Sequence, residues 1–424
     1  MAIDIICHSI LSGELWSEEK KMKANKRCFT VILCIIFLAS VILPLYTCYA
    51  EDSVITLGTK SAKVKTIKKR LQELRYLEKQ KFNNEYNEKT AEAVRVFQRL
   101  NGLPETGEVD AETEKVLFSD QAVYAPWPTL EPVATTAPVK EPDWPARDEK
   151  GYLDGGGEYF YEDEDEGQWI YLSSNLQIFI RKVCDPSIPL EWFETEILTR
   201  NGESMRTVMT DPDRPGTKYR YPYDIAVNHG MVLGFSDDFY ADRMTARQTV
   251  GIIIREGQII SEKTNRKAGH YLPNLDMLAQ YPDGRFEVYQ CNELTAGELM
   301  DRGAVNVFSF GPVLIRDGEI NELLYKYYRS TEPRQALGMI EPNHYYLLSI
   351  LGRISTSKGT MLQRVAEMMK AKGVKQALNL DGGNTLAIVF RGKILNRKAT
   401  YKKRTFYRTL TSLIGFGYTE SWED

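Results

Sequence analysis

The stretch that decides the fold of the larger part of this chain is ALNLDGGNTLAIVFRGKIL, residues 377–395. It contains three short, mostly apolar runs at 377–380, 386–390 and 393–395, which are separated by the loop that begins Asp381-Gly382-Gly383 and by Arg391-Gly392. Short apolar runs bounded by Gly and Asp are typical of β-strands joined by tight turns. We therefore predict three strands here, with the carboxylate of Asp381 at the end of the first.

The segment Asp381-Gly382-Gly383 is the first candidate for a functional loop. Glycine has no Cβ, so a ligand can approach the backbone closely at Gly382 and Gly383. The carboxylate of Asp381 would then face that ligand. The same residues also suit an ordinary Asp-Gly turn that has no function. Spacing alone leaves both interpretations open.

Residues 169–424 as a whole mix short strands with a few helices. Residues 250–260 are typical of a hairpin that turns at Glu256-Gly257, and 345–351 of a buried strand. The apolar spacing between 362 and 369 predicts a helix that Gly373 closes. Because these strands and helices alternate irregularly, we predict an α+β domain over 169–424 rather than a doubly wound sheet.

A small all-α domain is predicted upstream, at residues 53–118. Its first helix presents one apolar face, formed by Val64, Ile67, Leu71 and Leu74. Thr90 is placed to cap a second helix, which Asn101-Gly102 ends, and a third helix is expected around 111–117. The sequence therefore predicts a domain of three helices.

Residues 119–168 are expected to be a linker between these domains. Six prolines fall between 119 and 150, which favours an extended and semi-rigid chain. Five consecutive acidic residues follow at 162–166. Five carboxylates can bind Ca²⁺, but their spacing does not match an EF-hand loop. We interpret the run as a solvated acidic spacer.

The first 50 residues have the features of an export signal. A basic cluster at 20–27 precedes an apolar run at 28–46, and small residues follow at Cys48 and Ala50. We predict cleavage after Ala50 and a secreted or envelope-associated protein. The alternative is an uncleaved anchor, since the run is nearly long enough to span a bilayer. In that case the N-terminal segment is the only contact with the membrane.

The charge and cysteine content exclude other classes of protein. The 424 residues contain 54 Lys and Arg against 58 Asp and Glu, a net charge of −4, which lacks the basic excess of a nucleic-acid binder. Four of the six Cys lie in the first 50 residues. Cys184 and Cys291 remain, and they could form one disulfide or stay as two free buried thiols.

The residues needed by several enzyme classes are absent from the sequence after residue 50. Only His229, His270 and His344 remain there, and no His-Glu-x-x-His motif occurs, which disfavours a zinc peptidase. No Gly-x-Ser-x-Gly motif occurs and no Ser-x-x-Lys nucleophile motif stands out, which disfavours a serine hydrolase. Glycine loops that bind nucleotides are also missing. We expect His229 to be structural rather than catalytic.

Two segments resemble known families. The small domain resembles the peptidoglycan-binding-like domain of bacterial wall enzymes, through Leu57-Gly58, Val64, Leu71, Leu74, Leu77, Asn87, Thr90, Phe97-Gln98, Gly102-Leu103, Gly107, Val109-Asp110 and Thr113. Residues 169–424 resemble the phosphodiester glycosidase family, through Asp238-Phe239-Tyr240, Gly251, Gly257, Phe308 to Pro312, Arg334, Ala336, Gly338, Gly352-Arg353, Gly359, Asn379 to Gly383 and Asn396.

The second resemblance implies hydrolysis of a sugar-1-phosphodiester at the sugar carbon. Its leaving group is a phosphate monoester, a weak base, so a strong general acid is less necessary than in other glycosidases. Arg334 suits the phosphate, because a guanidinium matches it bidentately. Asp381 and Asp238 are the candidate catalytic carboxylates. The candidate substrate-binding residues are Arg353, Asn379, Gly382, Gly383, Thr385, Asn396, Ser309 and Gly311. Asn379 and Asn396 also suit turn or cap bonding, and each arginine also suits a buried ion pair.

The sequence departs from the family pattern at several positions. Ser236-Asp237 precede Asp238 where the family usually has Asn-Gly, and Leu351 stands where it usually has Asp. Asn384 replaces a third glycine, and Leu386 replaces a serine. These changes indicate either an altered substrate or a weakened catalyst.

Three functions remain open at this point. The first is a secreted cell-envelope hydrolase that cleaves a sugar-1-phosphodiester and binds the wall through its small domain. The second is a non-catalytic protein that binds wall or polysaccharide with the same residues. The third, a murein peptidase or glycosidase, is suggested by the small domain alone. No cofactor is certain; Ca²⁺ or Mg²⁺ is compatible with carboxylates and a phosphate, but no ligand spacing requires either.

Overall fold

A computed structural model describes residues 54–77, 82–125, 142–185, 188–238, 250–262, 275–328 and 330–420. The chain divides into two compact units, Met1–Thr129 and Leu130–Asp424. The predicted signal and its cleavage site after Ala50 lie outside the described residues, as does His270. None of the helices in the described part of the chain combines the length and the apolar character needed to cross a bilayer.

The first unit contains the three predicted helices: α3 (Ala62–Glu73), α4 (Glu88–Leu100) and α5 (Ala111–Leu117). Their apolar faces form one core that includes the fully buried Val64, Ile67, Leu71 and Phe97. The prediction that Thr90 caps α4 is wrong. The cap is Asn87, whose side chain accepts a hydrogen bond from the Thr90 backbone, because Thr90 already lies inside the first turn.

The second unit is mostly β, with a few short helices, and all its strand pairs are antiparallel. Its largest sheet has the order β1-β2-β3-β4-β15-β14-β16-β12-β13. The strands are β1 (Glu158–Asp163), β2 (Gln168–Ser173), β3 (Leu176–Asp185), β4 (Leu190–Thr199), β12 (Val313–Arg316), β13 (Glu319–Ile320), β14 (Arg334–Glu341), β15 (His344–Ile350) and β16 (Gln376–Leu380).

The smaller sheets follow the orders β10-β9-β11-β7-β8, β18-β17-β6-β21-β5 and β19-β20. Their strands are β5 (Arg206–Met209), β6 (Met231–Phe235), β7 (Ile252–Arg255), β8 (Gln258–Glu262), β9 (Asp276–Gln280), β10 (Phe286–Tyr289), β11 (Asn306–Phe310), β17 (Ile388–Phe390), β18 (Lys393–Ile394), β19 (Ala399–Tyr401), β20 (Arg404–Phe406) and β21 (Ser412–Tyr418). The helices of this unit are α6 (Pro222–Asn228), α8 (Ala296–Asp301), α9 (Leu323–Tyr327) and α10 (Leu362–Ala371).

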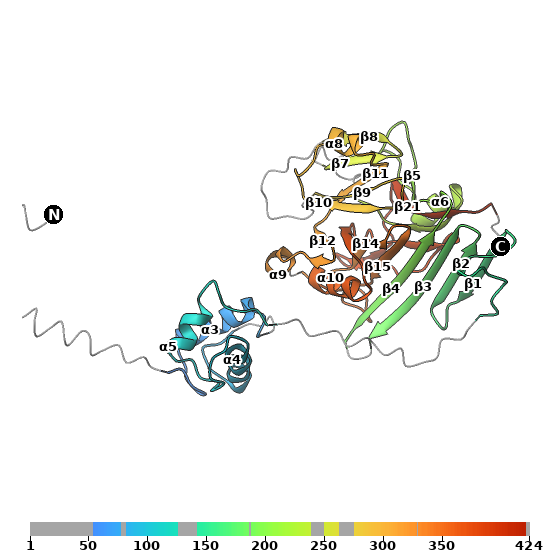
Figure 1. Ribbon diagram of the computed structural model, residues 1–424. Helices are drawn as coiled ribbons and strands as arrows, with labels where there is room; N and C mark the ends of the chain where they lie inside the picture. Colours follow the sequence, from blue (N-terminus) through green and yellow to red (C-terminus); the bar gives the residue numbers. More distant parts are fainter. Residues whose placement is uncertain are drawn as a thin grey trace, which may run out of the picture. The chain divides into compact units, whose positions relative to one another are not determined.

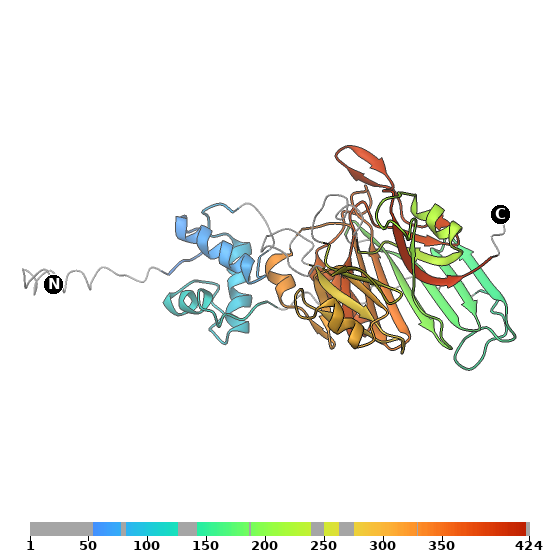
Figure 2. The ribbon, with the colours of Figure 1, turned by 90° about the horizontal axis from the view of Figure 1, so that it is seen from above.

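The core lies on both faces of the largest sheet. One face packs against β6, β17 and β21 through residues such as Leu347, Phe235, Ile388 and Phe416. The opposite face of β14, β15 and β16 is covered by α10. Strands β1 to β4 lie at one end of the unit, and α9 and α10 at the other (Figures 1 and 2). The C-terminal end of α10 still reaches β4, because Lys372, which follows the helix, donates to Glu194 at 2.8 Å.

Two expectations change in this unit. The predicted linker extends too far, because 158–163 form β1 and the acidic run 162–166 forms the end of that strand and its turn into β2. Tyr159 and Tyr161 of β1 pack against one cluster of buried residues and Phe160 against another. The acidic run that follows them directly led to the interpretation as a spacer. No disulfide joins Cys184 and Cys291 in the described part of the chain, and Cys184 is exposed rather than buried.

Candidate active site

The loop 381–385 begins where β16 ends, beside the start of β14. Gln335 pairs with Leu380, so Arg334 and Asp381 occupy the next position of the same ladder. The backbone N–H of Gly383 donates to the carbonyl of Pro333 at 2.9 Å. A Cβ at Gly382 would lie 2.4 Å from that carbonyl oxygen. The glycine at 382 is therefore required by the approach of the protein's own backbone.

Arg334 is nearly buried at the start of β14, with 6% of its surface exposed. Its guanidinium donates to the carbonyls of Ser330 and Thr360, at 2.7 and 3.2 Å. Burial, reinforced by the neighbouring guanidinium of Arg353, lowers the pKa of Arg334 to about 10, against the opposing effect of Glu332. The side chain is still a cation at neutral pH.

Arg353 is the arginine that lies against the glycine loop. Its guanidinium donates twice to the carboxylate of Glu332, at 3.0 and 2.7 Å. It also donates to the side chain of Asn384. A Cβ at Gly383 would lie 3.5 Å from Nη1 of Arg353. The sequence placed Arg334 first as the phosphate-binding residue, but Arg353 is the more exposed of the two.

Asp238 is fully buried after β6, in an ion pair that sequence reasoning missed. Nη2 of Arg255 donates to its Oδ1 at 2.7 Å, and the backbone N–H of Ser309 donates to its Oδ2 at 3.1 Å. Arg255 also donates to the carbonyl of Val307 at 2.7 Å, and its guanidinium lies 4.3 Å from the ring centroid of Phe308. One signal for this pair exists in the sequence: Arg255 is a charged residue that directly follows the apolar run 250–254.

Hydrogen bonds join the loop after β6 to the loop after β16. The backbone N–H of Asp381 donates to the carbonyl of Asp237 at 3.0 Å, and Oγ of Ser236 donates to the carbonyl of Asp381 at 3.1 Å. Adjacent residues of an extended strand normally point to opposite faces. Oγ of Ser412 donates to Asp237, whose Oδ2 nevertheless lies 3.9 Å from the same Arg255. Both carboxylates thus approach one guanidinium.

The remaining candidates mostly hold the loops together. Nδ2 of Asn379 donates to the carbonyl of Gly311 at 2.9 Å, and Asn396 accepts from the backbone of Ile388 at 2.9 Å. These are the turn-bonding roles that the sequence left open for the two asparagines. Oγ1 of Thr385 accepts from Arg408 at 2.8 Å, and Oγ of Ser309 donates to the carbonyl of Ile252 at 2.7 Å.

Asn384 and Leu386, two of the departures from the family pattern, have distinct structural roles. Nδ2 of Asn384 donates to the carbonyl of Ala399 at 3.1 Å, while its Oδ1 accepts from Arg353. Asn384 therefore connects the arginine to the first residue of the hairpin β19–β20. Leu386 is buried in the core between the sheets. The serine of the family pattern would bury a hydroxyl away from water at this position, which is unfavourable without a hydrogen-bond partner.

A small hollow lies beside this loop. Its volume is about 10 Å³, and its lining includes Gly352, Gly383, Asn384 and Asn396. That space is roughly what one water molecule needs. Within the described ranges, no group of three or more His, Cys, Asp or Glu is placed to hold a metal ion. A divalent cation stays a prediction.

Two family models match this chain. Residues 225–416 match the family described as phosphodiester glycosidase, and residues 60–117 match a peptidoglycan binding domain. The chain therefore contains a domain of each family, which confirms both resemblances and the order of a small helical domain before a mostly-β domain. The glycosidase model begins in α6, so β1 to β5 lie outside it.

Similar proteins match only part of this chain. An uncharacterized protein, SPbeta prophage-derived YomE of Bacillus subtilis (strain 168), is 26% identical over 167 residues, which is 39% of this chain and 25% of that protein. The match thus spans a quarter of the relative's length. A zebrafish N-acetylglucosamine-1-phosphodiester alpha-N-acetylglucosaminidase catalytic domain, auto-inhibited by its pro-peptide, matches at 17% identity and a TM-score of 0.44, over 62% of this chain and 88% of that one. A hypothetical protein from Synechocystis matches at 13% identity and a TM-score of 0.37, over 57% of this chain and 62% of that one.

Proposed function

We propose that this protein, whose residues 225–416 form a domain of the phosphodiester glycosidase family, hydrolyses a sugar-1-phosphodiester bond. The observation that carries the proposal is the guanidinium of Arg353 against Gly383, with the cation of Arg334 beside it. Two neighbouring cations beside a glycine loop suit a phosphodiester, because a guanidinium pairs with two phosphate oxygens at once.

The reaction needs few groups from the protein. The oxygen of water bonds to the anomeric carbon, the bond from that carbon to the phosphate oxygen breaks, and the phosphate monoester leaves with the electron pair. Arg353 would bind the departing phosphate and stabilise its charge. Asp381, at the entrance of the same loop, would direct the water or stabilise the positive charge that develops on the sugar. The proton released from water passes to a carboxylate and then to solvent.

The small domain supports a location at the cell wall. Residues 60–117 match a peptidoglycan binding domain, and we assign this domain the role of docking rather than catalysis. Together with the export signal predicted in the first 50 residues, this match supports a location outside the cytoplasm. The Pro-rich segment after the module would let the hydrolase domain search the glycan around a docked module. Plausible substrates are sugar-phosphate linkages of envelope polymers.

A second function, binding without catalysis, is favoured by the packing of the site. The hollow beside the loop holds about one water, and Asn384 fills space that the family leaves to glycine. Asp238 is committed to Arg255. These observations suit a domain that retains glycan binding and has lost turnover.

One assay separates the two functions. The purified full chain is incubated with an N-acetylglucosamine-1-phosphodiester, and the release of reducing sugar is followed. A hydrolase releases sugar faster than its Asp381→Asn variant, and Arg353→Lys lowers kcat/KM by about tenfold or more, the equivalent of one charge-assisted hydrogen bond. If several such diesters give no release above Asp381→Asn while wall glycan is still retained, the protein is a binder.

A further inference from the structure

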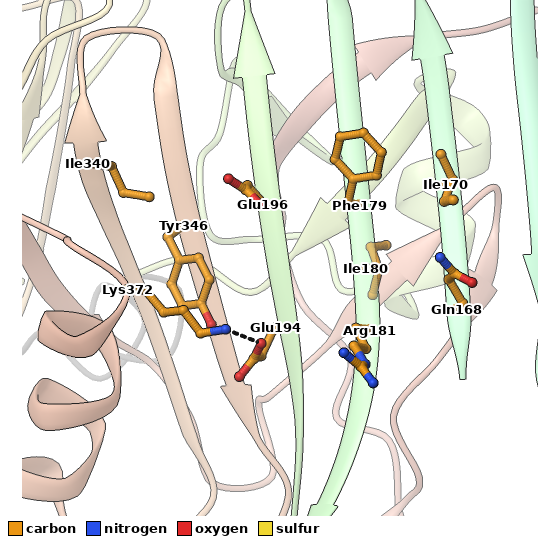
Figure 3. A pocket seen from close by; sticks show the side chains of 10 residues that line it. All are labelled: Gln168, Ile170, Phe179, Ile180, Arg181, Glu194, Glu196, Ile340, Tyr346 and Lys372. Carbon is orange, nitrogen blue, oxygen red and sulfur yellow. Dashed lines mark hydrogen bonds and ion pairs between the residues drawn. The ribbon is translucent and has the colours of Figure 1, made fainter. Parts of the chain in front are cut away.

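The larger unit has a second hollow, a groove on the outer face of its largest sheet. It has a volume of about 330 Å³ and is formed by Gln168, Ile170, Phe179, Ile180, Arg181, Glu194, Glu196, Ile340, Tyr346 and Lys372 (Figure 3). Its floor is the surface of β2, β3, β4 and β15, and Lys372, just after α10, lies at its side. The volume lies in the range of small-molecule sites.

The strand register arranges the groove in two parallel rows. In one row Ile170 pairs with Phe179, Phe179 with Glu196, and Glu196 with Tyr346. In the other row Gln168 pairs with Arg181, and Arg181 with Glu194. One row is therefore mainly aromatic and aliphatic, and the other is polar. A sugar ring presents apolar C–H faces and polar hydroxyl edges, so a glycan strand lying across these strands would meet a matching surface along its length.

The charged side chains of the two rows differ in whether they already have a partner. Glu194 accepts from Nζ of Lys372 at 2.8 Å and from the indole of Trp192 at 3.1 Å. Glu196 is paired with Nε2 of His344 at 2.7 Å. The guanidinium of Arg181, by contrast, has no side-chain partner among the described residues, although it lies between Gln168 and Glu194 on the sheet (Figure 3).

Gln168 adds a second unsatisfied group next to Arg181. Its Oε1 is buried and has no hydrogen-bond partner among the residues that the structure describes. Several other buried polar atoms in the described residues also lack a partner, so Gln168 supports a site here only through its position beside Arg181. The group that this pair offers to the groove is the guanidinium of Arg181, a strong donor for an anion.

We propose that this groove binds a glycan strand that carries phosphodiester groups, with Arg181 on a phosphate and the row of Ile170, Phe179 and Tyr346 under the sugar faces. The identity of the strand rests on the proposed function, because it is the polymer that the loop at 381 would cleave. Four strand steps separate β3 from β16, which at about 4.8 Å each is roughly 19 Å. The groove is therefore a separate subsite, which retains a polymer while the loop acts on one linkage of it.

The test compares a polymer with a single linkage. The full chain and its Arg181→Gln variant are titrated by calorimetry with an N-acetylglucosamine-substituted poly(glycerol phosphate), and with dextran as an uncharged polymer. Both proteins are also assayed for turnover of a single N-acetylglucosamine-1-phosphodiester. Arg302→Gln, an exposed arginine next to α8, is the matched control. Thermal unfolding of each variant checks that the fold is intact.

We expect Arg181→Gln to weaken binding of the anionic polymer by about tenfold or more, with Arg302→Gln unchanged. Turnover of the single linkage stays at the wild-type level, and added salt weakens the wild type more than the variant. Unchanged polymer affinity in Arg181→Gln, or equal wild-type affinity for dextran, overturns the proposal. The proposal of hydrolysis and the proposal of polymer binding in the groove can fail independently. If the protein shows no turnover at all, the calorimetric titration still measures whether the groove binds the polymer. Phe179→Leu should weaken polymer binding in the same assay, and an unaltered affinity there also counts against the groove.

Discussion

The ion pair between Asp238 and Arg255 allows a quantitative prediction about stability. Asp238 is completely buried, and the side chain of Arg255 is 2% exposed. Replacing one member of such a pair leaves a buried charge without compensation, which costs about 3–5 kcal/mol. In Asp238→Asn the carboxylate of Asp237, at 3.9 Å from the same guanidinium, provides partial compensation. We therefore expect Asp238→Asn to lose about 3 kcal/mol, the lower end of that range.

Urea unfolding measures this loss. The fluorescence of the buried Trp169 and Trp192 reports on the larger unit, and the midpoint is converted with an unchanged m-value. The double variant Asp238→Asn/Arg255→Gln removes both charges and should be more stable than Asp238→Asn alone, which gives the coupling energy of the pair. A loss below about 1 kcal/mol in Asp238→Asn, with no coupling to Arg255, would refute the buried pair. Asp238 would then be an accessible carboxylate and a better catalytic candidate.

Four further outcomes are expected. Asn384→Gly should raise kcat/KM for sugar phosphodiesters, because it releases Arg353 and enlarges the hollow; steady-state kinetics with Asn384→Ala as a comparison test this, and a fall in both variants would contradict it. Gly382→Ala should cost about 1–3 kcal/mol in urea unfolding, since its Cβ meets a backbone carbonyl; a neutral effect would mean that the loop is not held as described. Burial and the charge of a nearby arginine lower the pKa of His229, so on acidification the unfolded chain takes up the proton before the folded chain does. The free energy of unfolding should therefore fall as the pH drops from 6.5 through the pKa of the folded state. Thermal unfolding against pH should show a smaller fall for His229→Gln, and equal curves for the two proteins would count against this reasoning. Deleting residues 60–117 should reduce sedimentation with purified cell walls, and equal retention would defeat the docking role of the module.

Local structure was predictable where it depends on neighbouring residues. The turns Glu256-Gly257 and Arg391-Gly392 adopt positive φ at both positions, as tight hairpin turns require, and the sequence indicated both. The helix 111–117 has the bounds that were expected. The strand order was not predictable, because pairs such as β4 with β15 join residues about 150 positions apart, such as Glu196 and Tyr346.

The candidate site was predictable as a set of loops but not as a set of contacts. The sequence identified the loop at 381 and the two arginines, and the fold places Arg334 beside Asp381 and Arg353 against Gly383. It did not reveal that Asp238 is paired with Arg255, because that contact depends on how the loop after β6 packs against β7. Nor did it reveal that Gly382 is required by the carbonyl of Pro333. A glycine in the sequence indicates that some group approaches the backbone closely, but it does not indicate whether that group belongs to a ligand or to the protein.

The position of β1 at the edge of the largest sheet has a consequence for the behaviour of the protein in solution. An edge strand presents unpaired backbone groups to which another chain can add, and charged residues are one means by which proteins prevent such association. The tip of this strand carries Glu162 and Asp163, followed by the exposed Glu164, Asp165 and Glu166. Mutual repulsion between two such tips opposes edge-to-edge aggregation at neutral pH. Acidification, which neutralises the carboxylates, should therefore expose this edge to self-association and fibre formation.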